Sequence, residues 1–264
     1  MNYRLSDIAA LTGGTLLGED RSVSLVVTDS RNCTPERGAL FVAMRGERHD
    51  SHRFVGEMAR RGVEAFLLEY PVELPSGCGA VVVAHAIEAL QRWAAHHRSL
   101  FTGEVVAIVG SNGKTIVKEW MAQLMPPSVR MFRSPKSYNS QLGVALSLLM
   151  ADMQAEVVVI EAGISRPGEM ARLERMVRPD RVIFTALGEA HQENFESLEQ
   201  KVEEKLTMAR GARSVLYHSR YALLDKAIRD RYADRNLCDA ASVELPVGLP
   251  MHVVESEAGR GNFS

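Results

Sequence analysis

The sequence predicts an α/β protein in which a small N-terminal α/β domain precedes a larger domain with a mostly parallel sheet flanked by helices. Short apolar runs alternate with helix-compatible segments along most of the 264 residues, which is typical of strands joined by crossover helices. A glycine-rich loop, from Gly110 to Thr115, connects one such run to a helical segment. Polar residues at 102–104 separate this strand and loop from the alternating segments before them.

The N-terminal part alternates strands with helices. Its apolar runs predict strands at residues 24–28, 39–43, 65–68 and 80–83. Helices are predicted at residues 5–12, 52–61 and 87–99, and the last of these places Leu90, Trp93 and Ala94 on one face. We therefore expect this part to form a small α/β domain.

The alternation continues after the polar junction. The run at residues 105–109 leads through the glycine-rich loop into a predicted helix at 116–125. Further strands are predicted at residues 157–160, 182–185 and 214–218, and further helices at 144–150, 168–176, 198–209 and 221–234. This order predicts a parallel sheet covered on both faces. The alternation stops near residue 238, and we expect either a solvated tail or the truncation of a longer protein.

Composition excludes several classes of protein. The formal net charge of −2 gives no general attraction to nucleic acid or to anionic membranes. No apolar run approaches the roughly 20 residues of a membrane span, and the first residues lack the apolar core of a signal peptide. Cys33, Cys78 and Cys238 are scattered, as free thiols in a reducing compartment are. We expect a cytoplasmic protein with no nucleic-acid or membrane partner.

The glycine-rich loop has the residue order of a phosphate-binding loop: Gly110, Ser111, Asn112, Gly113, Lys114 and Thr115. Glycines let backbone N–H groups close around an anion, and the following helix directs its positive end toward that anion. The lysine would reach the outer phosphates of a nucleotide, and the threonine hydroxyl would ligate Mg²⁺. Ile108 stands where the common pattern has another glycine, so this is a short Gly-x-x-Gly-Lys-Thr loop. The alternative is a turn with an incidental lysine.

Two other predicted strands end in residues suited to metal binding. Glu161 follows the run 157–160, at the sheet edge where α/β proteins bind ligands, and a carboxylate there can hold Mg²⁺. His191 follows the run 182–185 on the same edge. The alternatives are a solvated carboxylate and a surface histidine. Lys205 belongs to a charged helix for which the residues alone favour a solvated face. We interpret the histidines at 49, 52, 96 and 97 as surface residues.

Two N-terminal loops, at residues 28–31 and 45–50, carry arginines suited to phosphate recognition. The residues alone favour ordinary turns for both.

Taken together, these segments resemble the Mur ligases, the ATP-dependent enzymes that build the peptide stem of peptidoglycan, from Leu5 to about Leu206. Residues 110–115 are similar to the ATP loop of the family, including the absence of the upstream glycine. Residues 161–163 with 167–170 are similar to its acidic metal-binding segment. Residues 188–205 resemble the segment that supplies a metal-ligating histidine and a modifiable lysine.

The resemblance also covers the substrate-binding regions. Residues 29–31, 38–43 and 46–47 resemble a UDP-substrate-binding domain shared by two branches of the family, and residues 137–144 are closest to the substrate loop of the MurF branch. The chain departs from that branch at Ser140 and at 165–166, where asparagine or an asparagine–histidine pair is usual. Residues 114–120 resemble the corresponding part of MurF–alanine racemase fusions.

The resemblance implies an activity and its site residues. The reaction would join D-alanyl-D-alanine to UDP-N-acetylmuramoyl-tripeptide through an acyl phosphate, with ATP converted to ADP and phosphate. Catalytic roles are implied for Lys114, Glu161, His191 and Lys205. Thr115 and Glu161 would hold a first Mg²⁺, and His191 with Lys205 a second. Because a cationic lysine cannot ligate Mg²⁺, Lys205 would have to be carbamylated. UDP-substrate contacts are implied for Ser30, Arg31, Gly46, Asn139 and Ser140.

The resemblance further implies a domain division. Residues 1–102 would bind the UDP substrate, and residues 103–264 would form a central ATP-binding domain, truncated at its end. Nothing after Cys238 resembles the C-terminal ligase domain of the family. Two alternatives stay open: a non-catalytic fragment that binds nucleotide and UDP-sugar, and a P-loop kinase or NTPase of another substrate class.

Overall fold

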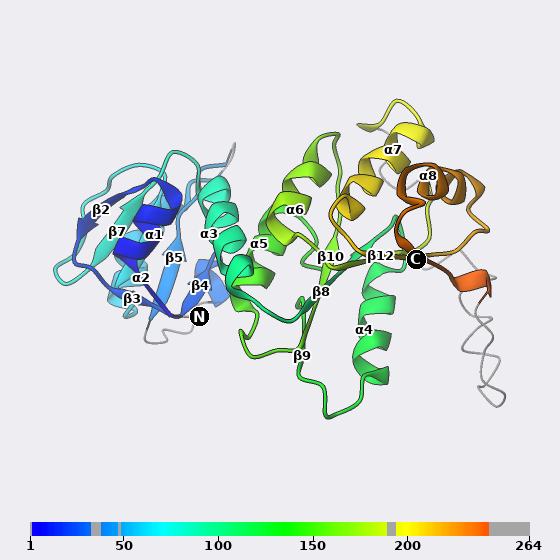
Figure 1. Cartoon of the computed structure of the whole chain (residues 1–264). Helices are drawn as coiled ribbons and strands as arrows, with labels where there is room; N and C mark the ends of the chain where they lie inside the picture. The colour runs from blue at the N-terminus through cyan, green and yellow to red at the C-terminus, as the bar shows by residue number, and fades with distance from the viewer. Residues whose placement is uncertain (1, 33–37, 47–48, 189–193, 243–264) are drawn as a thin grey trace.

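The computed structural model describes residues 2–32, 38–46, 49–188 and 194–242. These residues form two β-sheets with helices between and around them, which confirms the predicted α/β class (Figure 1). A two-stranded ribbon of β1 (Tyr3–Arg4) and β3 (Ser22–Val23) accompanies the first sheet. Within the described ranges, no helix is long and apolar enough to cross a membrane.

The first sheet has five strands in the order β2 (Thr15–Gly18), β7 (Gly79–Val82), β6 (Ala65–Leu68), β5 (Ala39–Val42) and β4 (Leu25–Val27). Strands β4 to β7 are parallel, and β2 pairs antiparallel at the edge. Every residue of β5 is buried, because Leu40 and Val42 join the core that contains α1 (Leu5–Thr12), whereas Phe41 packs toward α2 (Val55–Arg60). Burial on both faces explains its continuous apolar run.

The second sheet has six parallel strands in the order β13 (Asn236–Asp239), β12 (Ser214–Tyr217), β11 (Arg181–Phe184), β8 (Glu104–Val109), β10 (Val157–Ala162) and β9 (Met131–Arg133). Strand β8 lies between β10 and β11, so the carboxyl ends of these three strands meet at one edge of the sheet. This edge is where parallel α/β sheets bind ligands.

Helices cover both faces of the second sheet. The helix α4 (Lys114–Leu124) packs Val117 and Met121 against Val106 and Ile108 of β8. The opposite residues of β8 belong to the large core that also contains apolar side chains of the other helices. Those helices are α5 (Gln141–Met150), α6 (Glu169–Val177), α7 (Leu198–Leu206) and α8 (Ala222–Tyr232).

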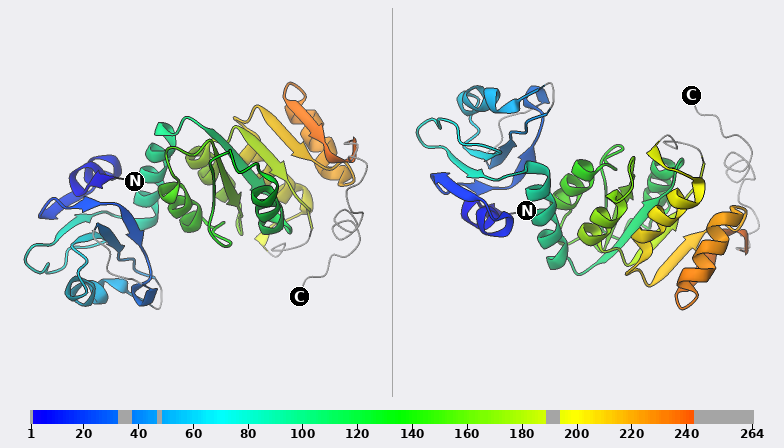
Figure 2. Two further views of the ribbon diagram at one scale, coloured as in Figure 1. Left: turned by 90° about the horizontal axis from the view of Figure 1, so that it is seen from below. Right: turned by 90° about the horizontal axis from the view of Figure 1, so that it is seen from above.

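The helix α3 (Ala86–Leu100) lies between the two sheets, as both views in Figure 2 show. It packs against α1 on one side and against α5 and α6 on the other. Trp93 is fully buried and meets the Tyr3 ring edge-on, with centroids 5.3 Å apart. Arg98 Nε donates to Val177 O at 2.8 Å, at the end of α6. One continuous core therefore joins both sheets. Of the junction expected at residues 102–104, residues 102 and 103 lie between α3 and β8, and Glu104 begins β8.

Several elements differ from the sequence expectation. Strands β1, β2, β3, β9 and β13 are not predicted by the apolar runs, because each is short and only partly buried. The strand β13 extends the regular fold to Asp239. The predicted helix at 52–61 begins as a 3-10 turn, η2 (Ser51–Phe54), before α2. Further 3-10 turns are η1 (Ser30–Asn32), η4 (Thr207–Ala209) and η5 (Ala240–Ser242).

The interpretation of the paired histidines as surface residues is wrong for two of them. His52 is buried, its Nδ1 lies 2.7 Å from Asp50 Oδ1, and its Nε2 accepts a hydrogen bond from the Glu69 backbone N–H. His97 is also buried, and burial lowers its pKa. Both rings therefore contribute to packing.

Candidate active site

The phosphate-loop residues lie directly beside the segment that follows β11. Ser111 N donates to Ala186 O at 2.8 Å, and Ser111 Oγ donates to Gly188 O at 3.0 Å. In the other direction, Thr185 Oγ1 donates to Asn112 O at 2.7 Å. These bonds fix the loop against the end of a neighbouring strand, so its backbone geometry is set before any ligand arrives.

Two glycines of the loop are required by geometry. Gly113 has a φ of +83°, a left-handed conformation that L side chains rarely adopt, and it forms the N-cap of α4. A Cβ at Gly110 would lie 1.9 Å from Thr185 Oγ1, so no side chain fits there. The helix begins at Lys114, two residues before the predicted start, and its first N–H groups follow the loop directly. This is the arrangement that binds phosphate in other proteins.

Three lysine side chains converge on the loop. The ammonium groups of Lys114 and Lys205 both donate to Gly110 O, each at 2.9 Å, and Lys201 donates to Gly188 O at 2.7 Å. Lys201 and Lys205 are 2% and 3% exposed. The expectation that their helix, α7, presents them on a solvated face is therefore wrong. Sequence reasoning assigned no role to Lys201.

The convergence changes the proton affinity of these amines. Burial and, to a smaller extent, the positive charges of Lys114 and Lys201 together lower the pKa of Lys205 to about 7. Burial also lowers the pKa of Lys114, although the carboxylate of Glu161 acts in the opposite direction. Buried cations that repel one another favour a bound anion. The loop region is thus electrostatically suited to a polyphosphate.

Glu161 lies at the end of β10 and is fully buried. Its Oε2 accepts a hydrogen bond from Thr115 Oγ1 at 3.0 Å. Its Oε1 lies 2.9 Å from Lys118 Nζ as an ion pair, yet accepts no hydrogen bond of good geometry from the described residues. Sequence reasoning missed Lys118. The available signal was its position four residues after Lys114, which places it on the same side of α4.

The segment predicted to be a substrate loop lies beside this pair. Ser137 Oγ is 3.4 Å from Thr115 Oγ1, and Asn139 O accepts a hydrogen bond from Gly163 N at 2.8 Å. Ser140 is the N-cap of α5, where its Oγ accepts a hydrogen bond from Gly143 N at 3.1 Å. The structure therefore brings this segment to the phosphate-loop edge of the sheet, and the Ser140 hydroxyl caps the N-terminus of α5.

The other predicted UDP-substrate residues lie in the first sheet's loops. Arg31 is paired with Asp29 at 3.0 Å, its side chain is 86% exposed, and the bond to Asp29 raises its pKa. Ser30 O accepts a hydrogen bond from Arg61, and Gly46 N donates to His49 O. Among the described residues, no hydrogen bond joins Ser30, Arg31 or Gly46 to the phosphate loop. Their predicted role stays a prediction.

His191, the predicted partner of Lys205 at the second metal, lies outside the described residues. The described ranges contain no cluster of three or more His, Cys, Asp or Glu that could hold a metal ion. Thr115 and Glu161 supply two oxygens on one edge, and Mg²⁺ usually takes few protein ligands and completes its shell with phosphate and water. Thr115 Oγ1 and Glu161 Oε2, which lie 3.0 Å apart, fit such an ion.

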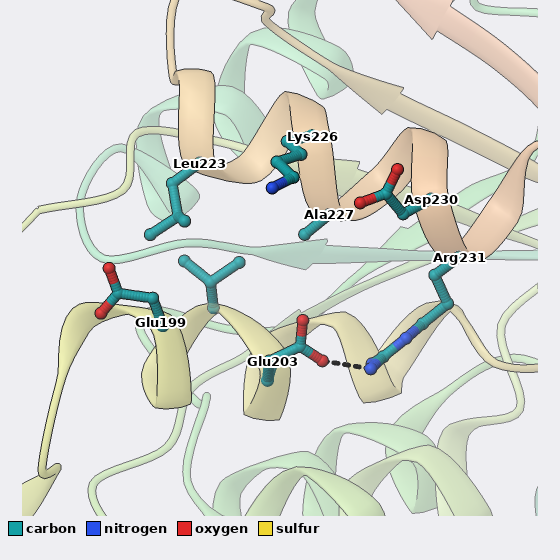
Figure 3. A pocket seen from close by; sticks show the side chains of 8 residues that line it. Glu199, Glu203, Leu223, Lys226, Ala227, Asp230 and Arg231 are labelled. Atoms are coloured by element: carbon teal, nitrogen blue, oxygen red, sulfur yellow. Dashed lines mark ion pairs between the residues drawn. The ribbon is translucent and has the colours of Figure 1, made fainter.

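A cavity of about 470 Å³ lies elsewhere, between α7 and α8 (Figure 3). Glu203 of α7 forms an ion pair with Arg231 of α8 across it. Helical spacing puts Glu199 and Glu203 on a different side of α7 from Lys201 and Lys205. The cavity is therefore separate from the lysine cluster.

The chain is similar in sequence to Mur ligases. Residues 108–227 match the Mur ligase middle domain. Over 211 residues, 78% of this chain, the sequence is 32% identical to the UDP-N-acetylmuramoyl-tripeptide--D-alanyl-D-alanine ligase of Bacillus subtilis. That alignment covers 46% of the Bacillus protein, so the chain spans about half the length of the curated relatives it matches.

Solved structures of two MurF proteins are similar to this chain in fold. MurF from Acinetobacter baumannii superposes with a TM-score of 0.76 at 23% identity, over 90% of this chain and 53% of that protein, which shows a shared fold. The MurF ligase of Thermotoga maritima, solved in complex with ADP, superposes with a TM-score of 0.70 at 28% identity. This superposition covers 81% of the present chain and 49% of the Thermotoga chain.

The lowered pKa of Lys205 predicts a pH-dependent change in stability. Between pH 7 and 10.5 the unfolded lysine keeps its proton and the folded one loses it, so the free energy of unfolding rises with pH over this window. Lys205→Met removes this burial penalty. We expect the variant to gain stability over the wild type at pH 7, and the gain to shrink toward pH 10.5. Urea unfolding in CO₂-free buffer measures this, and a gain that does not change with pH would contradict it.

Proposed function

Because this chain belongs to the Mur ligase family through its central domain, we propose that it supplies the ATP-binding and UDP-substrate-binding parts of a peptidoglycan ligase. The reaction is the one that names its Bacillus subtilis relative: D-alanyl-D-alanine is joined to UDP-N-acetylmuramoyl-tripeptide. One observation carries the proposal. Thr115 of the phosphate loop contacts Glu161 and also Ser137, which belongs to the segment predicted to bind substrate, and these contacts support adjacent places for nucleotide and acyl substrate.

In this proposal the part of the chain with the first sheet and the part with the second sheet bind different substrates. Residues 1–102 bind the UDP part of the substrate through Ser30, Arg31 and Gly46, and residues 103–264 bind ATP. The C-terminal ligase domain of a longer parent chain is the partner that completes the site and selects the amine. The coverage of about half the relatives' length is consistent with this division.

The chemistry follows from the charge of the reactants. A carboxylate is a poor acyl donor, because its leaving group would be oxide. One carboxylate oxygen therefore attacks the γ-phosphorus of ATP, ADP leaves, and an acyl phosphate forms. The D-Ala-D-Ala amine then attacks the acyl carbon, phosphate leaves and the amine proton is lost. An anionic carboxylate must approach an anionic triphosphate, so positive groups lower the barrier.

Lys114 and the loop amides provide the first part of that positive charge. In the structure, Lys114 Nζ donates to the loop carbonyls of Gly110 and Ser111. On nucleotide binding, the same ammonium would turn from these carbonyls toward the outer phosphates. The MurF ligase of Thermotoga maritima was solved in complex with ADP, which supports an adenine nucleotide as the ligand.

Two Mg²⁺ ions would supply the rest of the charge. Thr115 Oγ1 and Glu161 would hold the first ion, and their 3.0 Å contact supports that pairing. His191 and Lys205 would hold the second. When bound, the ions neutralise phosphate charge as it redistributes. The protein's own contribution is to fix the oxygens and the lysines around the place where the phosphates lie.

Carbamylation would give the Lys205 side chain an oxygen atom that can ligate Mg²⁺. The neutral Lys205 amine attacks CO₂, an N–C bond forms, one C–O π bond becomes an oxyanion, and a proton leaves to water. The pKa of about 7 supports this step, because a substantial fraction of the amine is then neutral near pH 7. The change from cation to anion also replaces repulsion from Lys114 by attraction.

A second candidate is binding without turnover. The observation that favours it is that the chain covers 46% of the Bacillus relative. A P-loop kinase or NTPase of another substrate class is a third possibility, and it shares only the loop chemistry.

Phosphate release separates these functions. We expect the chain joined to a C-terminal ligase domain to release phosphate from MgATP only when UDP-N-acetylmuramoyl-tripeptide and D-Ala-D-Ala are both present. Lys114→Met should lower this rate at least about 100-fold, since it removes a fixed charge from the transition state. Equal phosphate release without either acceptor would contradict the ligase proposal and favour an NTPase. Ligand binding with no release in the joined protein would favour the binding function.

The carbamate is tested by chemical rescue. In the joined protein, Lys205→Ala should lose most activity, because the oxygen ligand is absent. Small carboxylates such as acetate should restore part of the rate, since they can occupy the space of the missing group. Small primary amines serve as the control and should restore nothing. Rescue by amines, or no rescue by carboxylates, would count against a carbamylated Lys205.

A further inference from the structure

Lys118 is a fully buried charged residue to which neither the sequence pattern nor the proposed chemistry assigns a task. It lies in α4, one turn after Lys114, and its Nζ reaches two different parts of the chain, the segment after β9 and the end of β10. It donates to Ser134 O at 2.8 Å and to Lys136 O, and it forms the 2.9 Å ion pair with Glu161 Oε1. Such a position costs desolvation energy, which only several well-placed partners offset.

These contacts combine two hydrogen bonds with one ion pair. A lysine ammonium has three N–H groups, and two main-chain carbonyls and the Glu161 carboxylate lie within reach of them. Glu119 Oε1 lies farther away, at 3.3 Å, and the other carboxylate oxygen of Glu119, Oε2, pairs with Arg133. Lys118 is therefore committed to protein partners. Its position suits it to hold other groups in place.

The two carbonyls belong to the segment that leads into Asn139. Lys136 has a φ of +48°, a left-handed conformation that is unfavourable for a residue other than glycine. The Lys118 ammonium binds the carbonyl of this same residue, which helps to hold the unfavourable turn. After the turn, Ser137 approaches Thr115, and Asn139 O accepts the hydrogen bond from Gly163 N. One ammonium thus ties this segment to the nucleotide edge.

We propose that Lys118 is a positioning residue that holds residues 134–139 and Glu161 in one fixed arrangement, so that the acyl substrate lies in line with the outer phosphate of ATP. This inference rests on the proposed function and deepens it. Lys118 contacts neither reactant. Its loss should therefore weaken binding of the UDP substrate while the phosphate loop keeps its own affinity for nucleotide.

The test compares Glu161→Gln with the double variant Lys118→Met/Glu161→Gln. Lys118→Met alone leaves the Glu161 carboxylate buried without its cation, so it can fail to fold. In the double variant both charges are absent, and the difference from Glu161→Gln reports the loss of the Lys118 hydrogen bonds to Ser134 O and Lys136 O, together with the removal of a buried cation that Glu161→Gln leaves without its carboxylate. Calorimetry on the full chain measures the Kd of UDP-N-acetylmuramoyl-tripeptide and the Kd of ADP in metal-free buffer. Lys226→Met, an exposed lysine of α8, is the control for a changed lysine.

We expect the Kd of the UDP substrate to rise roughly tenfold from Glu161→Gln to the double variant, the size typical of losing hydrogen bonds to a charged group. The Kd of ADP should stay the same, and Lys226→Met should match the wild type for both ligands. Equal UDP-substrate affinity in the two Glu161 variants would overturn the positioning role, as would an equal loss for both ligands. If the wild-type chain binds ADP but no UDP substrate, the proposed function fails, and the inference fails with it.

Discussion

Parallel pairing of β8 with β10 and β11 is the constraint on which the candidate site depends. The register places Ala162 and Phe184 beside Val109, so the residues after all three strands emerge together. The phosphate loop, Glu161 and the segment beginning at Thr185 are neighbours for this reason alone. Since side chains alternate along a strand, a shift of one residue in the β8–β10 pairing would turn Glu161 away from Thr115. The apolar cores on both faces of the sheet oppose such a shift.

Buried charged side chains gather at this edge of the sheet. Lys114 and Lys205 bring positive charge to the carbonyl of Gly110, Lys201 brings it to the adjacent Gly188, and Lys118 pairs with Glu161. Burying these lysines costs folding energy, and a bound polyphosphate would return part of it through favourable pairing. The α3 helix adds a geometric element, because one core runs through it from the first sheet to the second. A substrate held by both sheets would therefore meet a site with a defined spacing.

The phosphate loop and the central strands could be predicted from the sequence, because short stretches of residues determine both. The loop was predictable because Gly110 and Gly113 meet strict steric requirements, and the central strands because burial on both faces leaves continuous apolar runs. The buried lysines were not predictable in this way. Lys118 and Lys201 have the polarity of surface residues, and only tertiary neighbours reveal their burial. Edge strands β9 and β13 are too short to produce a periodic signal. The roles of His191 and of the UDP-substrate residues remain predictions.

The central claim is that nucleotide and acyl substrate meet at Thr115, Glu161 and residues 137–139. A crystal structure of the chain with Mg²⁺, a non-hydrolysable ATP analogue and UDP-N-acetylmuramoyl-tripeptide measures this directly. The account predicts phosphates on the amides of residues 110–115, Mg²⁺ on Thr115 Oγ1, and the substrate carboxylate next to residues 137–139 and facing the γ-phosphate. Phosphates bound away from the loop, or a substrate carboxylate directed away from the γ-phosphate, would contradict it.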